Sequence, residues 1–223
     1  MSKNFLTLDD TKISNEFKKN GYVIRNVADT KSLDYIQSQF IKLVKKNYKF
    51  EKNYNNEKIL NFFHKKIKKN QLNDFRLKIL NQINKDEKCR YNYFKVSKPY
   101  LEAIVGNELV MQKKINLSIQ LPEDQDSLLA VHSDVWSGDS PFEVVVWLPL
   151  VNCFRTKSMY ILPANLINQF NKKISKKNYQ NSEKVFKLIE KKIKWIKINY
   201  GQVLIFNQSL PHGNRINKEL ETR

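Results

Sequence analysis

Two histidines and one aspartate have the residue types and the spacing to bind a metal ion. His132 and Asp134 stand two residues apart in the segment Leu128-Leu-Ala-Val-His-Ser-Asp134. If that segment is a β-strand, both side chains point to the same face, because side chains alternate along a strand. Their Cα atoms would then lie about 6.5 Å apart, so that an imidazole and a carboxylate could reach one cation.

A third ligand must come from a distant part of the chain. His212 is the only histidine after His132, and it follows the apolar run Val203-Leu-Ile-Phe206. Two histidines and a carboxylate that leave open positions form the facial triad of non-haem Fe(II) sites. An HxD pair alone also occurs on surface loops, but here two of only three histidines lie at the ends of apolar runs. We interpret His64 as an ordinary surface or half-buried residue.

Length and composition limit the class of protein. A chain of 223 residues is long enough for one domain with its own hydrophobic core. Cys89 and Cys153 lie in unrelated contexts without a CxxC motif, so we expect neither a disulfide framework nor a zinc knuckle. The N-terminus lacks the apolar core of a signal peptide, and no run approaches the roughly 20 apolar residues of a membrane span. These features predict a cytoplasmic protein and indicate nothing about its oligomeric state.

The strong positive charge raises the question of nucleic-acid binding. The formal net charge is +18, but only six of the 40 basic residues are arginines. Surfaces that read nucleic acids favour arginine for its bidentate geometry, whereas these lysines are spread along the predicted helical faces. The sequence is also rich in Asn and Ile, and a composition rich in Lys, Asn and Ile is typical of AT-rich codon usage. We therefore expect no nucleic-acid partner. The charge is compatible with a weak attraction to anionic substrates or membranes.

The first half of the sequence predicts helices around one early strand. A short helix is expected to end at Gly21, with a strand over residues 22–27 after it. Thr30 is expected to cap a longer helix, residues 72–83 to form another, and Gly106 to end a short one. The apolar positions that predict the two longer helices are Leu33, Ile36, Phe40 and Val44, and Leu72, Phe75, Ile79 and Ile83.

From residue 110 onward the pattern becomes that of strands. Residues 114–121 alternate strictly between apolar and polar side chains, which predicts a strand with one polar face. That face either meets solvent or lines a barrel interior that binds a polar ligand. Further strands are expected over residues 128–134, 143–150, 158–162 and 202–208. A helical insertion is expected over residues 164–191, and residues 193–198 and a turn at 199–201 lead from it to the last of these strands.

Helices first and short strands afterwards predict an antiparallel sandwich or barrel. We expect a single, mainly β domain with supporting helices, in which residues 1–107 are mostly helical and residues 108–223 form the barrel. The three candidate metal ligands would then lie near one mouth of the barrel, where small-ligand sites are common.

Several segments resemble a known enzyme superfamily. They are His132-Ser-Asp134, Trp147-Leu-Pro-Leu-Val, Tyr160-Ile-Leu-Pro163 and Gly201-Gln-Val-Leu-Ile-Phe-Asn-Gln-Ser-Leu-Pro-His212-Gly. Together they are similar to the Fe(II)/2-oxoglutarate-dependent dioxygenases, whose core is a double-stranded β-helix (jelly-roll or cupin-like), and most similar to the phytanoyl-CoA hydroxylase-like branch. Residues 131–143 and 156–163 further resemble a group of these oxygenases from bacterial surface-carbohydrate gene clusters. The resemblance covers most of the chain.

The resemblance implies that His132, Asp134 and His212 hold Fe(II) and leave three positions for 2-oxoglutarate and O2. It also implies an arginine for the distal carboxylate of 2-oxoglutarate. Arg223, eleven residues after His212, matches that place, and Arg215 is the second candidate. Further candidates for contact with the co-substrate are Asn116, Ser118, Gln120 and Tyr160, for each of which a purely structural role is an equal alternative.

The loop over residues 136–143 is the candidate for substrate contact, with Trp136 suited to stacking on a sugar ring and Asp139 to hydrogen bonding. Asp134 argues against a halogenase, in which a halide takes the place of the carboxylate. The expected activity is oxidation, such as hydroxylation, of a sugar or sugar-derived intermediate in surface polysaccharide biosynthesis. The alternatives are a cupin-like metal-dependent epimerase or isomerase without 2-oxoglutarate, and a non-catalytic barrel that binds carbohydrate or nucleic acid.

The resemblance also implies a final strand beyond the arginine. Since the sequence stops at Arg223, we expect this strand to be truncated and the terminal arginine to be mobile. A mobile arginine would hold a carboxylate poorly.

Overall fold

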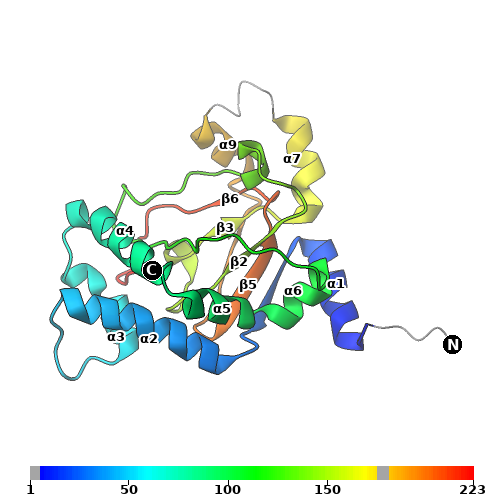
Figure 1. Cartoon of the computed structure of the whole chain (residues 1–223). Coiled ribbons are helices and arrows are strands. Elements are labelled where there is room, and N and C mark those ends of the chain that lie inside the picture. The colour runs from blue at the N-terminus through cyan, green and yellow to red at the C-terminus, as the bar shows by residue number, and fades with distance from the viewer. Residues whose placement is uncertain (1–5, 175–180) are drawn as a thin grey trace.

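The computed structural model describes residues 6–174 and 181–223, which form two facing antiparallel sheets with helices on both outer sides (Figure 1). The N-terminal residues 1–5 and residues 175–180 of the predicted insertion lie outside the described residues. The helices are α1 (Leu8–Asn20), α2 (Thr30–Asn47), α3 (Asn56–Asn61), α4 (Leu72–Ile83), α5 (Glu87–Lys95), α6 (Lys98–Val105), α7 (Ile167–Lys173) and α9 (Ser182–Ile189). The strands are β1 (Tyr22–Asn26), β2 (Val144–Trp147), β3 (Tyr160–Ile161), β4 (Lys194–Trp195), β5 (Gln202–Asn207) and β6 (His212–Gly213).

Local signals in the sequence set the ends of the first helices. Thr7 and Asp10 form a capping box at the start of α1, and Gly21 ends it in the left-handed conformation, with φ 78°. Helix α2 is capped by Asp29, whose side chain accepts the N–H of Ser32, so the predicted cap Thr30 is already the first helical residue. Among the helices in the described residues, none is both long and apolar enough to cross a membrane.

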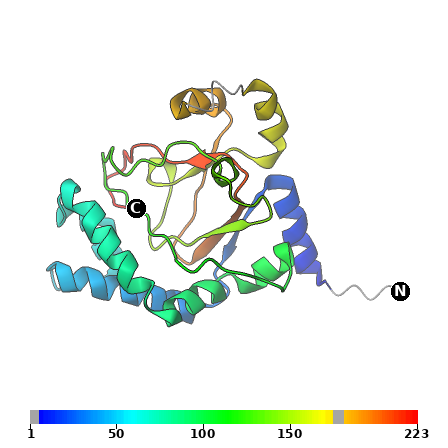
Figure 2. The ribbon, with the colours of Figure 1, turned by 45° about the horizontal axis from the view of Figure 1, so that its top comes forward.

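The first sheet has the strand order β1-β5-β2, with all pairs antiparallel. Side chains alternate along its central strand, β5, so that Leu204 and Phe206 face the second sheet while Val203 and Ile205 face helices. Figure 2 shows the helices α1 to α6, blue to green, along this side of the sheets. This first sheet is therefore buried on both faces.

The second sheet has the order β4-β3-β6. On its inner face Met159 and Ile161 pack with Phe206 of the first sheet, and on its outer face Tyr160 and Leu162 pack against the insertion that contains α7 and α9. These two helices, yellow and orange, lie on the opposite side of the sheets from α2 to α6 (Figure 2). His212, one of the three candidate metal ligands, thus belongs to a sheet that has support on both faces.

The expectation of a mainly β chain is not confirmed, because helical residues outnumber strand residues in the described parts. Residues 114–121 are not a regular strand, and within the described residues they pair only at Gln120, whose N–H and C=O both bond to Arg223 at 2.9 Å. The predicted strand over residues 128–134 makes one bridge, at His132. In these two segments the expected strand pairing is thus limited to Gln120 and His132.

The end of the described chain is held in place, which corrects the expectation of a mobile terminal arginine. Besides the pairing of Arg223 with Gln120, the N–H of Thr222 donates to the carbonyl of Asn61 in α3 at 2.7 Å. The hydroxyl of Thr222 accepts the N–H of His64 at 3.2 Å. Contacts to two distant segments therefore fix the backbone on either side of the last peptide bond.

Candidate metal centre

Backbone hydrogen bonds bring His132, Asp134 and His212 to one place. The N–H of each histidine donates to the carbonyl oxygen of the other, at 3.0 and 2.8 Å. The carbonyl of Gln208 accepts the N–H of Asp134 at 3.1 Å and the hydroxyl of Ser133 at 3.0 Å. Because Gln208 directly follows β5, these bonds attach the HxD pair to both sheets at once.

The three side chains direct their ligand atoms toward a common centre. One ligand atom from each lies within 4.8 Å of the other two. Oδ1 of Asp134 is 3.5 Å from Nε2 of His132, and Oδ2 is 3.9 Å from Nε2 of His212. Asp134 reaches this position as the first residue of the 3-10 turn η3 (Asp134–Ser137), and not from a continuous strand as predicted. All three side chains can reach one ion at this centre.

The hydrogen bonds of the two imidazoles fix which nitrogen is available to a metal. Nδ1 of His132 is 2.9 Å from the carbonyl of Ala130, and Nδ1 of His212 is 2.8 Å from the carbonyl of Leu210. A carbonyl oxygen only accepts, so each Nδ1 carries a proton and donates it. In its neutral form each ring then carries a lone pair on Nε2 that a metal would bind, and each ring has a fixed orientation, as is usual for metal-binding histidines.

The charge states also suit a cation. Burial lowers the pKa of His212 to about 4, so that this imidazole is neutral at neutral pH. Burial raises the pKa of Asp134, but the hydrogen bond to His132 and the charges of both histidines outweigh this effect and leave the pKa below its ordinary value. For His132, burial lowers the pKa, and the bonds to Asp134 and Ala130 more than offset it. An ionised carboxylate and a buried neutral imidazole fit a divalent first-row metal.

Arg223 is a partly buried arginine with no carboxylate partner among the described residues. Its Nη2 donates to the hydroxyl oxygen of Ser118 at 2.9 Å. Desolvation by burial lowers the pKa of its guanidinium, and a carboxylate ligand would offset that desolvation. Arg215, the second candidate, instead makes an exposed ion pair with Glu183 at 2.7 Å, and its guanidinium lies over the ring of Phe186.

The remaining polar residues predicted on residues 114–121 differ in their surroundings. Asn116 is exposed. Gln120 is fully buried, and its Nε2 donates to the carbonyl of Arg215 at 2.7 Å, while its Oε1 has no hydrogen-bond partner among the described residues. Nε2 of Gln120 thus binds the main chain, and Oε1 is a buried acceptor without a hydrogen-bond partner among the described residues.

Tyr160, a candidate for contact with the co-substrate, lies on the outer face of the second sheet. In β3, Ile161 is opposite His212 and Tyr160 is opposite Gly213, so Tyr160 and His212 lie on opposite faces of the sheet. The Tyr160 ring packs in the outer core, 5.3 Å from the ring of Phe186. Its role is to fill the space between the sheet and the insertion.

The loop over residues 136–143 lies next to the metal ligands. Its backbone folds back so that the N–H of Asp139 donates to the carbonyl of Asp134 at 3.4 Å, and the side-chain amide of Gln208 donates to the carbonyl of Ser140. The ring of Trp136 stacks on Phe170 of α7, with centroids 6.1 Å apart and planes 22° apart. Trp136 thus anchors the loop to the insertion, while Asp139 is exposed.

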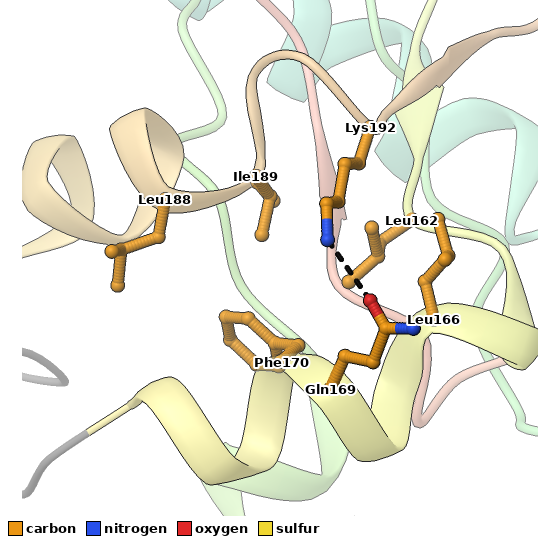
Figure 3. Close-up of a pocket in the computed structure, with 7 residues that line it drawn as sticks. All are labelled: Leu162, Leu166, Gln169, Phe170, Leu188, Ile189 and Lys192. Carbon is orange, nitrogen blue, oxygen red and sulfur yellow. Dashed lines mark hydrogen bonds between the residues drawn. The ribbon is translucent and has the colours of Figure 1, made fainter.

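The cavity between α7, α9 and the outer face of β3 is separate from this centre (Figure 3). It measures about 10 Å³, room for a single water molecule. Lys192 donates to Oε1 of Gln169 at 3.0 Å across one side of it. The residues around it are Leu162, Leu166, Gln169, Phe170, Leu188, Ile189 and Lys192. It is part of the packing between the insertion and the sheet.

The sequence interpretation missed Gln208 and Lys157. Gln208 stands within the quoted segment that ends at His212, but only the structure shows that its carbonyl holds Asp134. Lys157 directly precedes the predicted strand over residues 158–162, without any pattern that marks it, yet it is fully buried. A buried lysine is rare enough to indicate a specific partner.

No protein-family model matches this sequence, and no curated protein matches it. Solved structures do match. The non-heme alpha-ketoglutarate-dependent carbocyclase SnoK from nogalamycin biosynthesis is similar with a TM-score of 0.54 and 10% sequence identity, over 98% of this chain and 81% of SnoK. HygX from Streptomyces hygroscopicus, with nickel and 2-oxoglutarate bound, is similar with a TM-score of 0.51 and 12% identity, over 98% of this chain and 84% of HygX. The chain therefore shares the cupin-like fold of these proteins, as the sequence predicted.

Proposed function

We propose that this protein is an Fe(II)- and 2-oxoglutarate-dependent oxygenase that acts on a small, sugar-like molecule. The observation that carries the proposal is the convergence of His132, Asp134 and His212 on one centre, with the carboxylate between the two Nε2 atoms. This donor set is the facial triad of non-haem Fe(II) oxygenases. The fold shared with SnoK, and with HygX, which was solved with a metal and 2-oxoglutarate, supports the same class.

In this proposal the three ligands hold Fe(II), and Arg223 binds the distal carboxylate of 2-oxoglutarate. Bound Fe(II), with 2-oxoglutarate and O2, supplies the oxidation of a C–H bond, while 2-oxoglutarate is converted to succinate and CO2. Ser118 orients the guanidinium of Arg223 through its hydroxyl. The retained Asp134 leaves no ligand position to a halide, so we propose oxygenation and not halogenation.

The proposed substrate is a sugar or a sugar-derived intermediate of surface polysaccharide biosynthesis, because residues 131–143 and 156–163 resemble a group of oxygenases from bacterial surface-carbohydrate gene clusters. The loop over residues 136–143 supports this choice, because it lies against the metal ligands and presents Asp139 to solvent. Phe142 in the same loop is 89% exposed and could stack on a sugar ring. Trp136 supports the loop from behind, against Phe170.

The experiment is an aerobic assay of succinate formation from 2-oxoglutarate by the Fe(II)-loaded protein. Slow succinate formation is expected without a substrate, and a panel of monosaccharides and nucleotide sugars should contain members that accelerate it. The Asp134→Ala variant should form none, and Arg215→Met should match the wild type, because the Arg215 side chain is paired with Glu183 on the surface. Turnover of a sugar without any need for 2-oxoglutarate would instead support a cupin-like epimerase or isomerase.

A further inference from the structure

Lys157 is a fully buried lysine outside the metal centre. It is the last residue of the turn η4 (Arg155–Lys157), which precedes β3. Its ammonium donates to Oδ1 of Asn61 at 2.7 Å and to Oε2 of Glu221 at 2.6 Å. Burying an ammonium ion costs free energy unless the ion is paired and hydrogen-bonded. The question is therefore which part of the structure the pairing of Lys157 holds in place.

Both hydrogen-bond partners of Lys157 are connected to the segment that ends at Arg223. Glu221 stands two residues before Arg223 in the sequence. Asn61 binds the residue between them, because its main-chain carbonyl accepts the N–H of Thr222 at 2.7 Å. Residues 217–223 form no regular strand. Main-chain bonds to Asn61 and Gln120 hold the last two residues, and the side-chain contact of Lys157 adds a bond to Glu221.

Lys157 also keeps the carboxylate of Glu221 away from the guanidinium of Arg223. The Glu221 side chain is 32% exposed and only two residues away from Arg223, so without Lys157 it is free to turn toward that guanidinium. Among the described side chains, the guanidinium of Arg223 now forms a hydrogen bond only to Ser118. An ion pair with Glu221 would occupy the N–H groups that a carboxylate ligand needs.

We infer that Lys157 is a positioning residue of the co-substrate site. By binding Glu221 and Asn61, it places Arg223 and leaves the guanidinium free for the distal carboxylate of 2-oxoglutarate. This inference rests on the proposed function, in which Arg223 binds that carboxylate.

The test measures ligand binding to Ni(II)-loaded protein by calorimetry, without turnover. It compares 2-oxoglutarate with pyruvate, which has the same 2-oxo acid end but no distal carboxylate. Lys157→Met should weaken 2-oxoglutarate binding by about ten-fold or more and leave pyruvate binding unchanged. The double variant Lys157→Met/Glu221→Gln should recover part of the loss, because a neutral amide competes poorly for Arg223. Lys192→Met, which removes an exposed lysine, should match the wild type.

Two outcomes overturn the inference: unchanged 2-oxoglutarate binding by folded Lys157→Met protein, or equal losses for 2-oxoglutarate and pyruvate, which would indicate a general structural role. If Lys157→Met does not fold, the double variant carries the comparison. It should bind 2-oxoglutarate at least about three-fold more weakly than the wild type, with pyruvate binding unchanged, and wild-type affinity would overturn the inference. Wild-type protein that binds nickel but not 2-oxoglutarate contradicts the proposed function itself, so the wild-type titration separates the two failures.

Discussion

His132 and His212 bond to each other's backbone in both directions, and their imidazole centroids lie 4.2 Å apart. This pairing joins two segments that are far apart in the sequence. Each ring is oriented by a carbonyl two residues before it, at Ala130 and at Leu210. The backbone therefore determines the direction of both Nε2 atoms, and a metal ion would find ligands that need little rearrangement.

Replacing Asp134 by alanine should abolish most of the metal affinity without unfolding the protein. The substitution removes one of three ligands, whereas the bond from the N–H of residue 134 to Gln208 belongs to the main chain and persists. We expect the dissociation constant for Co(II) to rise by roughly 100-fold or more, measured by calorimetry. His64→Ala is the control, and equal Co(II) affinity of the two variants would show that the triad is not the metal site.

Replacing Arg223 by methionine should weaken the use of 2-oxoglutarate specifically. We expect the KM for 2-oxoglutarate to rise at least about ten-fold, since a bidentate charge-assisted contact is lost, with unchanged Co(II) affinity. Arg223→Lys should be intermediate, because an ammonium cannot make the bidentate contact. Arg215→Met is the matched control, as Arg215 is engaged by Glu183 on the surface. A larger effect from Arg215→Met than from Arg223→Met would reverse the assignment.

Tyr160→Phe should leave 2-oxoglutarate binding unchanged and should not destabilise the fold. The Tyr160 hydroxyl is buried and has no hydrogen-bond partner among the described residues, so its removal is expected to change the free energy of unfolding by between zero and about +1 kcal/mol. Denaturant unfolding measures the free energy of unfolding, and a 2-oxoglutarate titration measures the binding of the co-substrate. A marked loss of 2-oxoglutarate affinity would contradict the placement of Tyr160 on the outer face.

Gly213→Ala should disturb the strand that carries His212. A Cβ at residue 213 would lie 2.8 Å from the carbonyl oxygen of Leu129 and 2.8 Å from the Tyr160 hydroxyl, which is closer than van der Waals contact. We expect a loss of about 1–3 kcal/mol in the free energy of unfolding, measured with denaturant. Adding Tyr160→Phe should recover only part of this loss, because the Leu129 carbonyl remains. A free energy of unfolding equal to that of the wild type would contradict this prediction, because it would mean that the β6 backbone can shift away from the added Cβ without losing stability.

The sequence was sufficient for features that depend on local chemistry. The glycine that ends α1 and the apolar spacing of α2 and α4 determine these helices without help from distant residues. The triad was also readable, because few residue types bind metals and the chain has only three histidines. The three side chains converge as the sequence predicted, but Asp134 reaches the centre from a 3-10 turn and not from the predicted strand.

Features that depend on distant partners could not be predicted. A shift of one residue in register moves a side chain to the other face of a sheet, and this is why the face on which Tyr160 lies was not readable from the sequence. The anchoring of Arg223 and of Thr222 before it depends on Gln120, Asn61 and Ser118, which are all far from them in the sequence. The same holds for Lys157, whose partners are far away in sequence on both sides.

The central claim is that His132, Asp134 and His212 hold an Fe(II) ion to which 2-oxoglutarate also binds. Anaerobic titration of the Fe(II)-loaded protein with 2-oxoglutarate tests it most directly, by visible absorption. We predict a weak charge-transfer band that saturates at one equivalent of 2-oxoglutarate and is absent from the Asp134→Ala variant. A folded, Fe(II)-loaded wild-type protein that shows no such band would contradict it.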